Sequence, residues 1–322
     1  MLKNLLNKAL EEQASDIHIK SNYGTYLRIN NELIKQNIIF SNLETLNIAN
    51  MLNSKITNYN TEQDFSSNYL KINLRCNLYQ TSNSNYNLAI RILNNKPKSL
   101  NELGLPAKKI EHILDNKYGL ILISGATGHG KTTTLASLIE LINTNYNYHI
   151  ITIEDPIEYR FNSNKSLIDQ REVGIDTESF VKALRAALRQ DPDVIVIGEL
   201  RDIETIRTAI WAAETGHLVL ATIHAGDALE TIDKLVQYFP NEQTIIRYSL
   251  ANSLKAIISQ RLYISKTYNK KICLCDLLIN NLLIKKFIKE NDLQSIKNEM
   301  ESNVNMILRD KSEKEYKHLG II

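Results

Sequence analysis

Glycines followed by a lysine and a threonine form the most chemically specific stretch of the chain. Residues 125–132 read GATGHGKT and fit the pattern Gly-x-x-x-x-Gly-Lys-Ser/Thr at every fixed position. Glycines let the backbone curl so that successive N–H groups point inward, and such a nest binds polyphosphate. Lys131 can then reach the β- and γ-phosphates, while the hydroxyl of Thr132 can take one place on a shared Mg²⁺. The loop therefore predicts a nucleoside triphosphate site.

We expect the whole loop and the start of the following helix to contact the nucleotide. A plain glycine turn is the alternative, but such a turn needs neither the lysine nor the hydroxyl. His129 is unusual inside the pattern, and we expect it to be a solvated loop residue whose side chain is not a ligand. The predicted nucleotide-binding set is Gly125, Ala126, Thr127, Gly128, His129, Gly130, Lys131, Thr132 and Thr133.

Acidic residues stand at the ends of two predicted strands. The segment ITIEDPIEY carries Glu154 and Asp155, and the segment DVIVIGELRD carries Glu199. An ATPase needs one carboxylate to polarise the attacking water, and a carboxylate or its bound water to hold Mg²⁺. Glu199 and Thr132 are therefore the predicted Mg²⁺ residues, partly through water. The alternative for each acid is a helix cap, and this reading competes more strongly for Asp155 than for Glu199.

Two histidines flank the strand LVLATI, His217 before it and His224 after it. A single histidine is more often structural than catalytic, but two at the ends of one strand in a phosphate-binding sheet make both readings open. A metal site is less favoured, because a whole strand separates the two rings and no cysteine accompanies them.

Helices and strands alternate from residue 107 onward. Strands that are apolar on both faces and alternate with helices are typical of a parallel sheet covered on both sides, with ligands at the carboxyl ends of the strands. Beyond Thr231 we expect only helices, two or three of them amphipathic. The predicted helices are 107–116, 132–143, 177–189 and 203–215, and the predicted strands are 120–124, 149–154, 194–198 and 217–223.

The first hundred residues predict a separate small α+β domain. An amphipathic helix over 2–13 precedes the alternating segments SDIHIK, TYLRINNELIK, YLKINLRCNLYQ and YNLAIRIL, which are typical of half-buried antiparallel strands. A helix over 43–52 would be capped by Ser41 or Asn42. The segment 94–98 (NNKPK) is the predicted linker, so the expected domains are 1–96 and 97–322, the latter helical from about 231.

Composition sets few further limits. The 322 residues are 43% hydrophobic and 23% charged, with a formal net charge of +2, which demands neither nucleic acid nor an anionic membrane as partner. No apolar run approaches a membrane span and the first residues carry acids, so we expect a cytoplasmic protein. Three cysteines, Cys76, Cys273 and Cys275, form no C-x-x-C pair and argue against a disulfide frame or a structural zinc site.

Taken together, the motifs resemble a known family. GATGHGKT, ITIEDPIEY, QREVG, ALRQDPDVIVIGELRD and AAETGHLVLATIHAGDALETIDKLVQYFP resemble, in order and spacing, the Walker A, Asp box, Walker B and His box segments of the bacterial type II/IV secretion ATPase superfamily. The nearest branch is that of the PilT-like retraction ATPases of type IV pili. The segments SDIHIK and LRINNELIK resemble the PAS-like domain of this family, so the resemblance covers nearly the whole chain.

The resemblance implies an α/β fold: a RecA-like P-loop core, a PAS-like N-terminal domain and a helical C-terminal region. It also implies a homo-hexamer that binds ATP and Mg²⁺ and works on an inner-membrane platform protein, with membrane association only through partners. By matching motif, Glu154 is the Asp-box acid, Glu199 the Walker B glutamate that activates water, and His217 and His224 the His-box residues. Arg75 and Arg91 match the basic residues with the arginine-finger role.

Departures from the family pattern concern the direction of force. A four-cysteine zinc loop and a longer N-terminal region, which the extending and type II secretion ATPases carry, are missing, and this favours the retraction branch. The C-terminal helix that reads AIRNLIRE in retraction ATPases is LIKKFIKE here, residues 283–290. An effector role and a plain packing surface are equally open for this helix.

Two other functions remain as alternatives. A RecA-like motor on nucleic acid would use the same core, but the balanced charge and the lack of a clustered basic and aromatic stretch weigh against direct nucleic-acid binding. An orphan regulatory ATPase without a pilus is the other alternative, because the C-terminal helix has drifted. GTP specificity is not expected, since no Asn/Thr-Lys-x-Asp segment follows the loop.

Overall fold

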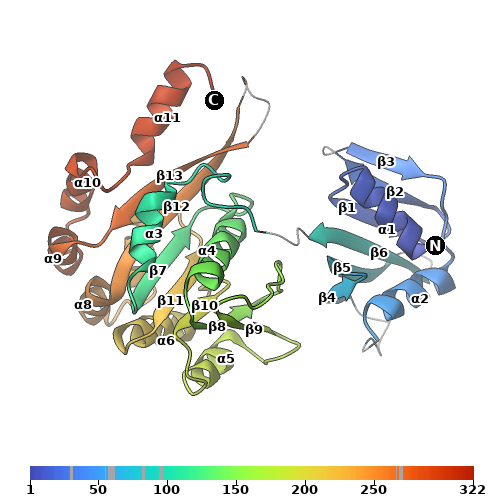
Figure 1. Cartoon of the computed structure of the whole chain (residues 1–322), viewed down its shortest axis with the longest axis horizontal. Helices are drawn as coiled ribbons and strands as arrows, with labels where there is room; N and C mark the ends of the chain where they lie inside the picture. Colours follow the sequence, from blue (N-terminus) through green and yellow to red (C-terminus); the bar gives the residue numbers. More distant parts are fainter. Residues whose placement is uncertain are drawn as a thin grey trace. The chain divides into compact units, whose positions relative to one another are not determined.

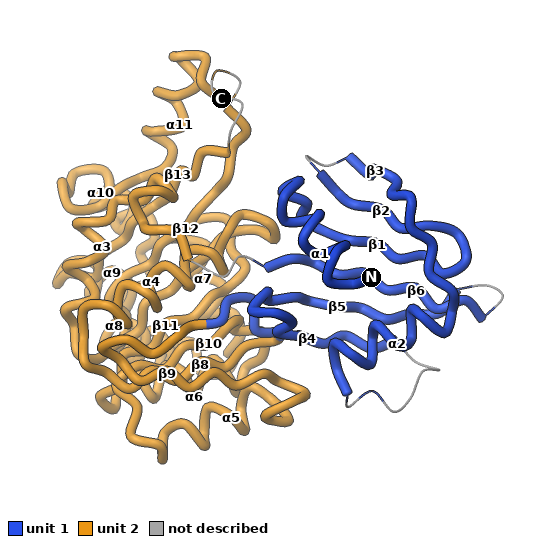
Figure 2. The backbone as a smooth tube through the Cα atoms, turned by 45° about the vertical axis from the view of Figure 1, so that its right-hand side comes forward, with its two compact units in different colours: residues 1–96, 156–160 blue, residues 97–155, 161–322 orange. Residues whose placement is uncertain are grey.

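The fold is described from a computed structural model of the 322-residue chain. It describes residues 1–29, 32–54, 56, 62–81, 84–93, 97–265, 267 and 271–322. The chain divides into two compact units, which Figure 2 shows in different colours. Unit 1 comprises residues 1–96 and 156–160, and unit 2 comprises residues 97–155 and 161–322. Each unit has its own hydrophobic core and is described by itself.

Unit 1 is an antiparallel sheet with two helices (Figure 1). Its strands lie in the order β3-β2-β1-β6-β5-β4. Apolar side chains from both helices and from the inner face of the sheet, such as Leu6, Ile17 and Ile90, form one buried cluster. The elements are α1 (Leu2–Glu11), β1 (Asp16–Lys20), β2 (Gly24–Ile29), β3 (Glu32–Gln36), α2 (Asn42–Leu52), β4 (Gln63–Tyr69), β5 (Ile72–Thr81) and β6 (Asn85–Leu93).

The structure refines the predicted N-terminal elements. The cap of α2 is Ser41, whose hydroxyl accepts the N–H of Glu44 while the Glu44 carboxylate accepts the N–H of Ser41. The predicted strand that begins at Tyr69 is wrong at its start: Leu70 and Lys71 have positive φ and form the tight turn between β4 and β5. Strand β4 was not predicted because most of its residues are polar and only Phe65 is fully buried. Residues 94–96 of the predicted linker lie outside the described residues.

Unit 2 is built on one sheet of seven strands in the order β13-β12-β7-β11-β10-β8-β9. All neighbouring strands are parallel except the β12–β13 pair. The strands are β7 (Gly119–Ser124), β8 (His149–Glu154), β9 (Leu167–Glu172), β10 (Val194–Ile197), β11 (Leu218–Ile223), β12 (Leu254–Ile264) and β13 (Lys271–Ile279). The carboxyl ends of β7, β11, β10 and β8 are therefore consecutive along one edge.

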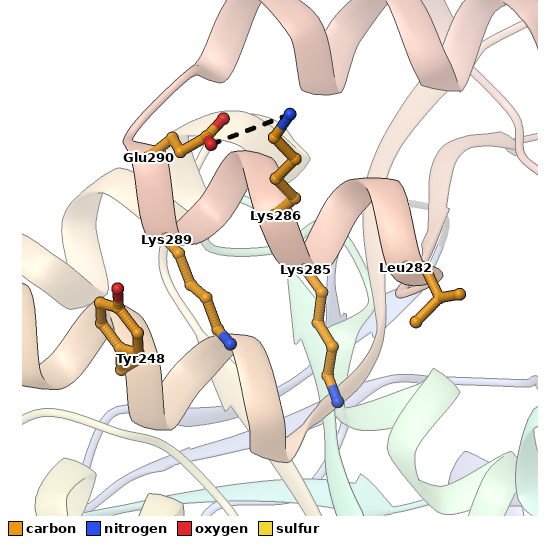
Figure 3. Close-up of a pocket in the computed structure, with 6 residues that line it drawn as sticks. All are labelled: Tyr248, Leu282, Lys285, Lys286, Lys289 and Glu290. Atoms are coloured by element: carbon orange, nitrogen blue, oxygen red, sulfur yellow. Dashed lines mark ion pairs between the residues drawn. The ribbon is translucent and has the colours of Figure 1, made fainter.

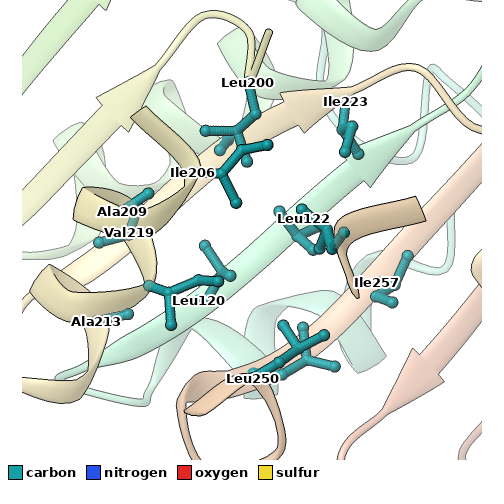
Figure 4. Close-up of a cluster of buried hydrophobic side chains, with 14 of the residues drawn as sticks. Leu120, Leu122, Leu200, Ile206, Ala209, Ala213, Val219, Ile223, Leu250 and Ile257 are labelled. Carbon is teal, nitrogen blue, oxygen red and sulfur yellow. The ribbon is translucent and has the colours of Figure 1, made fainter. Parts of the chain in front are cut away.

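Helices cover both faces of this sheet (Figure 1). On one face, Ile121 and Ile123 of β7 pack with α3 and α4. On the other face, Leu120 and Leu122 pack with the remaining helices of the core, as Figure 4 shows for part of this cluster. Because successive side chains of a strand point to opposite faces, burial on both faces requires the continuous apolar run that predicted this sheet. The helices are α3 (Ala107–Leu114), α4 (Lys131–Asn145), α5 (Phe180–Ala187), α6 (Ile203–Glu214), α7 (Ala228–Gln237), α8 (Gln243–Ser253), α9 (Leu282–Glu290), α10 (Leu293–Ser302) and α11 (Arg309–His318).

The C-terminal region is mainly helical, but the prediction that everything beyond Thr231 is helical is wrong. Strands β12 and β13 occupy 254–264 and 271–279 and pair with each other. β12 also pairs in parallel with β7, so these segments extend the central sheet. Most of their apolar side chains are buried, among them Ile257, Ile258, Cys275 and Leu277. Short apolar runs of this kind fit a buried strand as well as a helix, and periodicity alone did not separate the two.

Within the described part of the chain, no helix combines the length and the apolar character that crossing a bilayer requires.

Candidate nucleotide-binding site

The glycine loop lies between a fully buried strand and a long helix. β7 ends at Ser124, the loop follows, and α4 begins at Lys131 with Gly130 in the left-handed conformation at its N-cap (φ +84°). The unpaired N–H groups and the positive end of the α4 dipole therefore face the loop. Because β11 and β10 follow β7 in the sheet, the residues after their carboxyl ends lie beside this loop.

Three side chains, one at the start of α4 and two after the ends of β11 and β10, form one hydrogen-bonded line. Lys131 Nζ lies 3.3 Å from Nδ1 of His224, which follows β11. Nε2 of the same ring lies 2.7 Å from Oε1 of Glu199, which follows β10. The ammonium of Lys131 also donates to the carbonyl oxygens of Gly125, at 2.9 Å, and Ala126, at 3.2 Å. The structure thus joins the predicted phosphate lysine to the predicted catalytic carboxylate.

The partners of His224 determine its protonation state. A lysine ammonium has only protons to give, so Nδ1 is the acceptor and the Nε2–H group donates to Glu199. Burial, together with the positive charge of Lys131, lowers the pKa of His224 below its ordinary value, although Glu199 acts in the opposite direction. The ring is therefore neutral at neutral pH, and the Glu199 carboxylate receives an uncharged donor from it. Burial also lowers the pKa of Lys131.

A guanidinium holds the other oxygen of Glu199. Nε and Nη2 of Arg201 each lie 2.8 Å from Oε2 of Glu199, and Nη1 lies 3.6 Å from the carboxylate of Asp155 at the end of β8. These acids raise the pKa of Arg201 further. The helix-cap alternative for Glu199 does not hold, because the N-cap of α6 is Asp202, which accepts the N–H of Thr205. Arg201 was not among the predicted site residues, and its only signal in the sequence is its position two residues after Glu199.

Glu154, the predicted Asp-box acid, is buried at the end of β8. Its Oε1 atom accepts hydrogen bonds from the hydroxyl of Thr152 at 2.7 Å and from Nε2 of Gln170 at 3.2 Å. Gln170 belongs to β9, a strand that the sequence analysis did not predict and that contains most of the QREVG motif. Because β8 is the neighbour of β10, Glu154 lies at the same sheet edge as Glu199.

The prediction that His129 is a solvated loop residue is wrong. Its Nδ1 atom accepts the backbone N–H of Leu262 at 2.8 Å, and its carbonyl oxygen accepts Nε2 of Gln260 at 2.6 Å. Both partners belong to β12, more than 130 residues away in sequence, so no local pattern could have indicated them.

Three other predicted site residues, His217, Arg75 and Arg91, are not members of this hydrogen-bonded line. His217 precedes β11, at the amino-terminal edge of the sheet, and its Nδ1 atom lies 3.2 Å from the carbonyl oxygen of Ala212. His217 therefore lies at the opposite edge of the sheet from the carboxyl ends, where ligands are expected. Arg75 and Arg91 belong to unit 1, where they are directly opposite each other on β5 and β6. Arg91 forms an ion pair with Asp16 at 2.8 Å.

A pocket lies between α8 and α9, in the region of the LIKKFIKE segment. It has a volume of about 370 Å³ and is lined by Tyr248, Leu282, Lys285, Lys286, Lys289 and Glu290 (Figure 3). Lys286 pairs with Glu290 at 3.9 Å, and the ammonium of Lys289 lies 5.0 Å from the centre of the Tyr248 ring. The buried side of α9, with Ile284 and Ile288, packs into the core of unit 2. This helix therefore has both a packing face and an exposed basic face.

A mainly parallel sheet with a glycine loop after β7, a lysine at the start of α4 and an acid after β10, two strands away from β7, defines a P-loop protein with a RecA-like core. The model of the family described as type II/IV secretion system protein matches residues 1–314. The chain belongs to this family, and it is a PilT-like member of the secretion ATPase superfamily.

Three similar proteins support this membership. The type IV pilus retraction ATPase PilT of Pseudomonas aeruginosa is 36% identical over 297 residues, which are 90% of this chain and 86% of PilT. The uncharacterized protein YggR of Escherichia coli is 47% identical over 204 residues, which are 63% of this chain and 62% of YggR. The crystal structure of the pilus retraction motor PilT with bound ADP superposes with a TM-score of 0.90 at 39% identity, covering 99% of this chain and 93% of that chain.

Proposed function

We propose that the chain hydrolyses ATP to ADP and phosphate with Mg²⁺, and that a homo-hexamer of it is the motor of a type IV pilus or secretion machine, working in the retraction direction. The observation that carries this proposal is the hydrogen-bonded line from Lys131 through His224 to Glu199. It joins a phosphate-binding lysine to a carboxylate able to activate water. The similarity to a pilus retraction ATPase, and to a solved motor that contains ADP, supports it.

In this proposal, nucleotide binding begins with Lys131. Its ammonium is held by the carbonyl oxygens of Gly125 and Ala126 and by His224. The β- and γ-phosphate oxygens carry more negative charge than these neutral acceptors, so Lys131 exchanges them for the phosphates. The N–H groups of the loop and of the first turn of α4 complete the phosphate nest.

Hydrolysis then depends on Glu199. Its carboxylate accepts a proton from the water that attacks the γ-phosphate, so the group must be ionised and correctly oriented. His224 donates to Oε1 and Arg201 to Oε2, which fixes the plane of the carboxylate. Oε2 accepts two N–H groups of Arg201, whereas Oε1 accepts one from His224 and can accept a second hydrogen bond from the water.

The residues present fit Mg²⁺ bound together with phosphates. Among the described residues, no group of three or more histidine, cysteine, aspartate or glutamate side chains could hold a metal ion alone. Mg²⁺ in nucleotide sites instead uses one or two protein oxygens along with substrate phosphates and water. Thr132, in the first turn of α4, and Glu199 offer oxygens of the required kind. When bound, Mg²⁺ would neutralise charge on the phosphate oxygens.

The remaining proposed roles come from the family resemblance. Glu154 is the Asp-box acid, and the hydrogen bonds from Thr152 and Gln170 keep its carboxylate fixed at the end of β8. Arg75 and Arg91 supply positive charge to the γ-phosphate, in a ring where one subunit completes the site of its neighbour. His217 retains its proposed His-box role, in which it would act away from the loop of its own subunit.

The basic face of α9 is the proposed contact to the partner, an inner-membrane platform protein reached from the cytoplasmic side. Lys285 and Lys289 have no ion-pair partner among the described residues, while Leu282 is 86% exposed beside them. An acidic segment with apolar side chains fits this combination. Lys285→Glu should weaken capture of the platform protein, while Lys314→Glu, a charge reversal on the exposed face of α11, should not. Equal capture by both variants would contradict this contact.

A nucleotide-binding and phosphate-release experiment tests the ATPase proposal. Lys131→Ala should abolish phosphate release and weaken ADP binding in calorimetry, because the phosphates lose their direct cation. Lys182→Ala is the matched control, since Lys182 is an exposed α5 lysine paired with Glu178. Thr132→Ser should retain activity because it keeps the hydroxyl. Full phosphate release by Lys131→Ala would contradict the proposal.

A further inference from the structure

The outer half of β12 lies directly against the glycine loop. Pairing between β12 and β7 ends at Ser259 opposite Ser124, and β12 then continues alone on that side to Ile264. A Cβ atom built at Gly125 would be 2.6 Å from the carbonyl oxygen of Gln260. Real Cβ atoms do not approach backbone so closely, so only glycine fits at this point of contact. β12 therefore packs directly against one side of the glycine loop, and this part of β12 is called the wall below.

Two hydrogen bonds connect this wall to the centre of the loop, and both end on His129. The side chain of Gln260, which is 2% exposed, donates to the carbonyl oxygen of His129 at 2.6 Å. The backbone N–H of Leu262 donates to Nδ1 of the imidazole at 2.8 Å. Without the ring, this N–H on the free edge of β12 would lack its partner.

The first of these bonds determines where the next N–H group points. In a planar trans peptide, the C=O of one residue and the N–H of the next point in opposite directions. Because Gln260 holds the carbonyl of His129 toward β12, the N–H of Gly130 is directed away from β12. That direction is the one required of a donor in a phosphate nest.

The second bond exists only while Nδ1 of His129 is unprotonated. Burial lowers the pKa of His129, and the positive charges of Arg261 on β12, Lys131 on α4 and Arg309 on α11 lower it further. The ring is thus a neutral acceptor at neutral pH. On protonation, Nδ1 would become a donor facing the N–H of Leu262, and the bond would be lost.

We propose that Gln260 and His129 are positioning residues that fix the glycine loop on β12, so that its N–H groups are oriented for phosphate before nucleotide arrives. The inference rests on the proposed nucleotide binding. It goes beyond that proposal because the conformation of the glycine loop is held by β12, a strand that is not part of the GATGHGKT motif. A glycine-rich loop has many conformations, and fixing it in advance removes part of the entropy cost of binding.

ADP affinity of the full chain, measured by calorimetry between pH 7.5 and pH 5.5, tests this proposal. His129→Ala removes the acceptor and should weaken ADP binding about fivefold at pH 7.5, as expected for one lost hydrogen bond. His129→Asn places an acceptor oxygen at the position of Nδ1 but cannot protonate, so it should bind like the wild type at pH 7.5. Gln260→Met, which keeps the volume without the donor, should weaken binding by a similar factor.

The ADP affinities measured at acidic pH distinguish a positioning role of His129 from a general loss of structure in the variants. The affinity of the wild type should fall relative to His129→Asn as the pH decreases, because only the wild type loses the bond to Leu262. The protonation of ADP itself and of His224 cancels in this ratio. His149→Asn, which changes a histidine of β8 paired with Asp169 of β9, should keep the wild-type profile.

Hydrogen exchange at the amide of Leu262 gives a second readout that needs no nucleotide. Its protection should be lost in His129→Ala and kept in His129→Asn. Two results would overturn this inference but not the proposed function. They are parallel pH profiles for the wild type and His129→Asn, and unchanged ADP affinity in His129→Ala and Gln260→Met. Failure of the wild type to bind ADP would overturn the proposed function as well.

Discussion

Nε2 of His224 lies 2.7 Å from Oε1 of Glu199, and the ring is neutral although it contacts a carboxylate. The explanation is the opposite side of the imidazole, where the ammonium of Lys131 donates to Nδ1. A positive charge at that distance, combined with burial, outweighs the carboxylate and lowers the pKa of His224. The histidine therefore transmits no formal charge between the phosphate loop and Glu199, while it fixes the positions of both side chains.

This lowered pKa predicts a pH dependence of stability. Between the ordinary histidine value of about 6.5 and the lowered value, the unfolded chain binds a proton at His224 that the folded chain does not. The free energy of unfolding must therefore decrease as the pH falls through this window. His224→Asn removes this contribution, so urea unfolding between pH 7.5 and 5.5 should show a shallower pH dependence than the wild type. Parallel pH dependences would contradict the neutral state of the ring.

Alanine substitutions at Gly125 and Gly128 distinguish the cost of a packing clash from the cost of backbone strain. Both have positive φ, at +153° and +79°, but a Cβ at Gly128 meets nothing within 4 Å, whereas one at Gly125 meets Gln260 of β12. Gly128→Ala should lower the free energy of unfolding by about 1 to 2 kcal/mol through strain. Gly125→Ala should cost about 1 to 3 kcal/mol more through the clash. Equal unfolding free energies in urea titrations would show that β12 does not constrain the loop.

Arg309 of α11 and Asp276 of β13 form a buried ion pair, with Nη1 3.8 Å from Oδ2, and Arg309 also contacts the loop after His224. The N–H of Arg309 donates to Asp276 Oδ1 at 2.7 Å, and Nη1 donates to the carbonyl oxygen of Gly226 at 2.9 Å. Burial raises the pKa of Asp276. Arg309→Met should destabilise the protein by about 3 kcal/mol, because it leaves this carboxylate buried without its cation. Adding Asp276→Asn should recover part of the loss in thermal unfolding, and an additive double variant would contradict the pairing.

Arg75 and Arg91 face each other across β5 and β6, an arrangement that does not favour stability, because like charges directly opposite in a sheet repel. The proposed arginine-finger role would require a positive charge at these positions in spite of this repulsion. Arg75→Gln should lower the steady-state rate of ATP hydrolysis at least tenfold while leaving the stability of the chain unchanged or slightly higher. Asp16→Asn, which releases Arg91 from its ion pair, is a control that should change stability more than hydrolysis. Normal turnover by Arg75→Gln would contradict the finger role.

The sequence predicted those parts of the site whose chemistry is local. The glycine loop, Lys131 and Glu199 each follow directly from a strand of buried apolar residues, so their pattern and their position at one sheet edge could be inferred together. The role of β12 could not be inferred, because Gln260 and His129 are 131 residues apart and β12 itself was expected to be helical. Its apolar residues fit either period, and only its pairing with β7 and β13 determines that it is a strand.

The position of His217 relative to the glycine loop also could not be predicted from the sequence. A motif placed two histidines at the ends of one strand, and the strand then separates them by its full length, about 20 Å for six residues. Only His224 reaches the loop. Periodicity predicts that a strand exists, but the edge at which each flanking residue lies follows from strand direction in the assembled sheet.

The most direct test of the central claim is a single-turnover measurement on Glu199→Gln. Glutamine keeps the size and hydrogen-bonding capacity of the side chain but cannot accept the proton of water. The variant should still bind ATP with Mg²⁺, and the bound ATP should be hydrolysed at least a hundredfold more slowly than by the wild type, the range expected for loss of a general base. Hydrolysis at the wild-type rate in the Glu199→Gln protein would contradict the account.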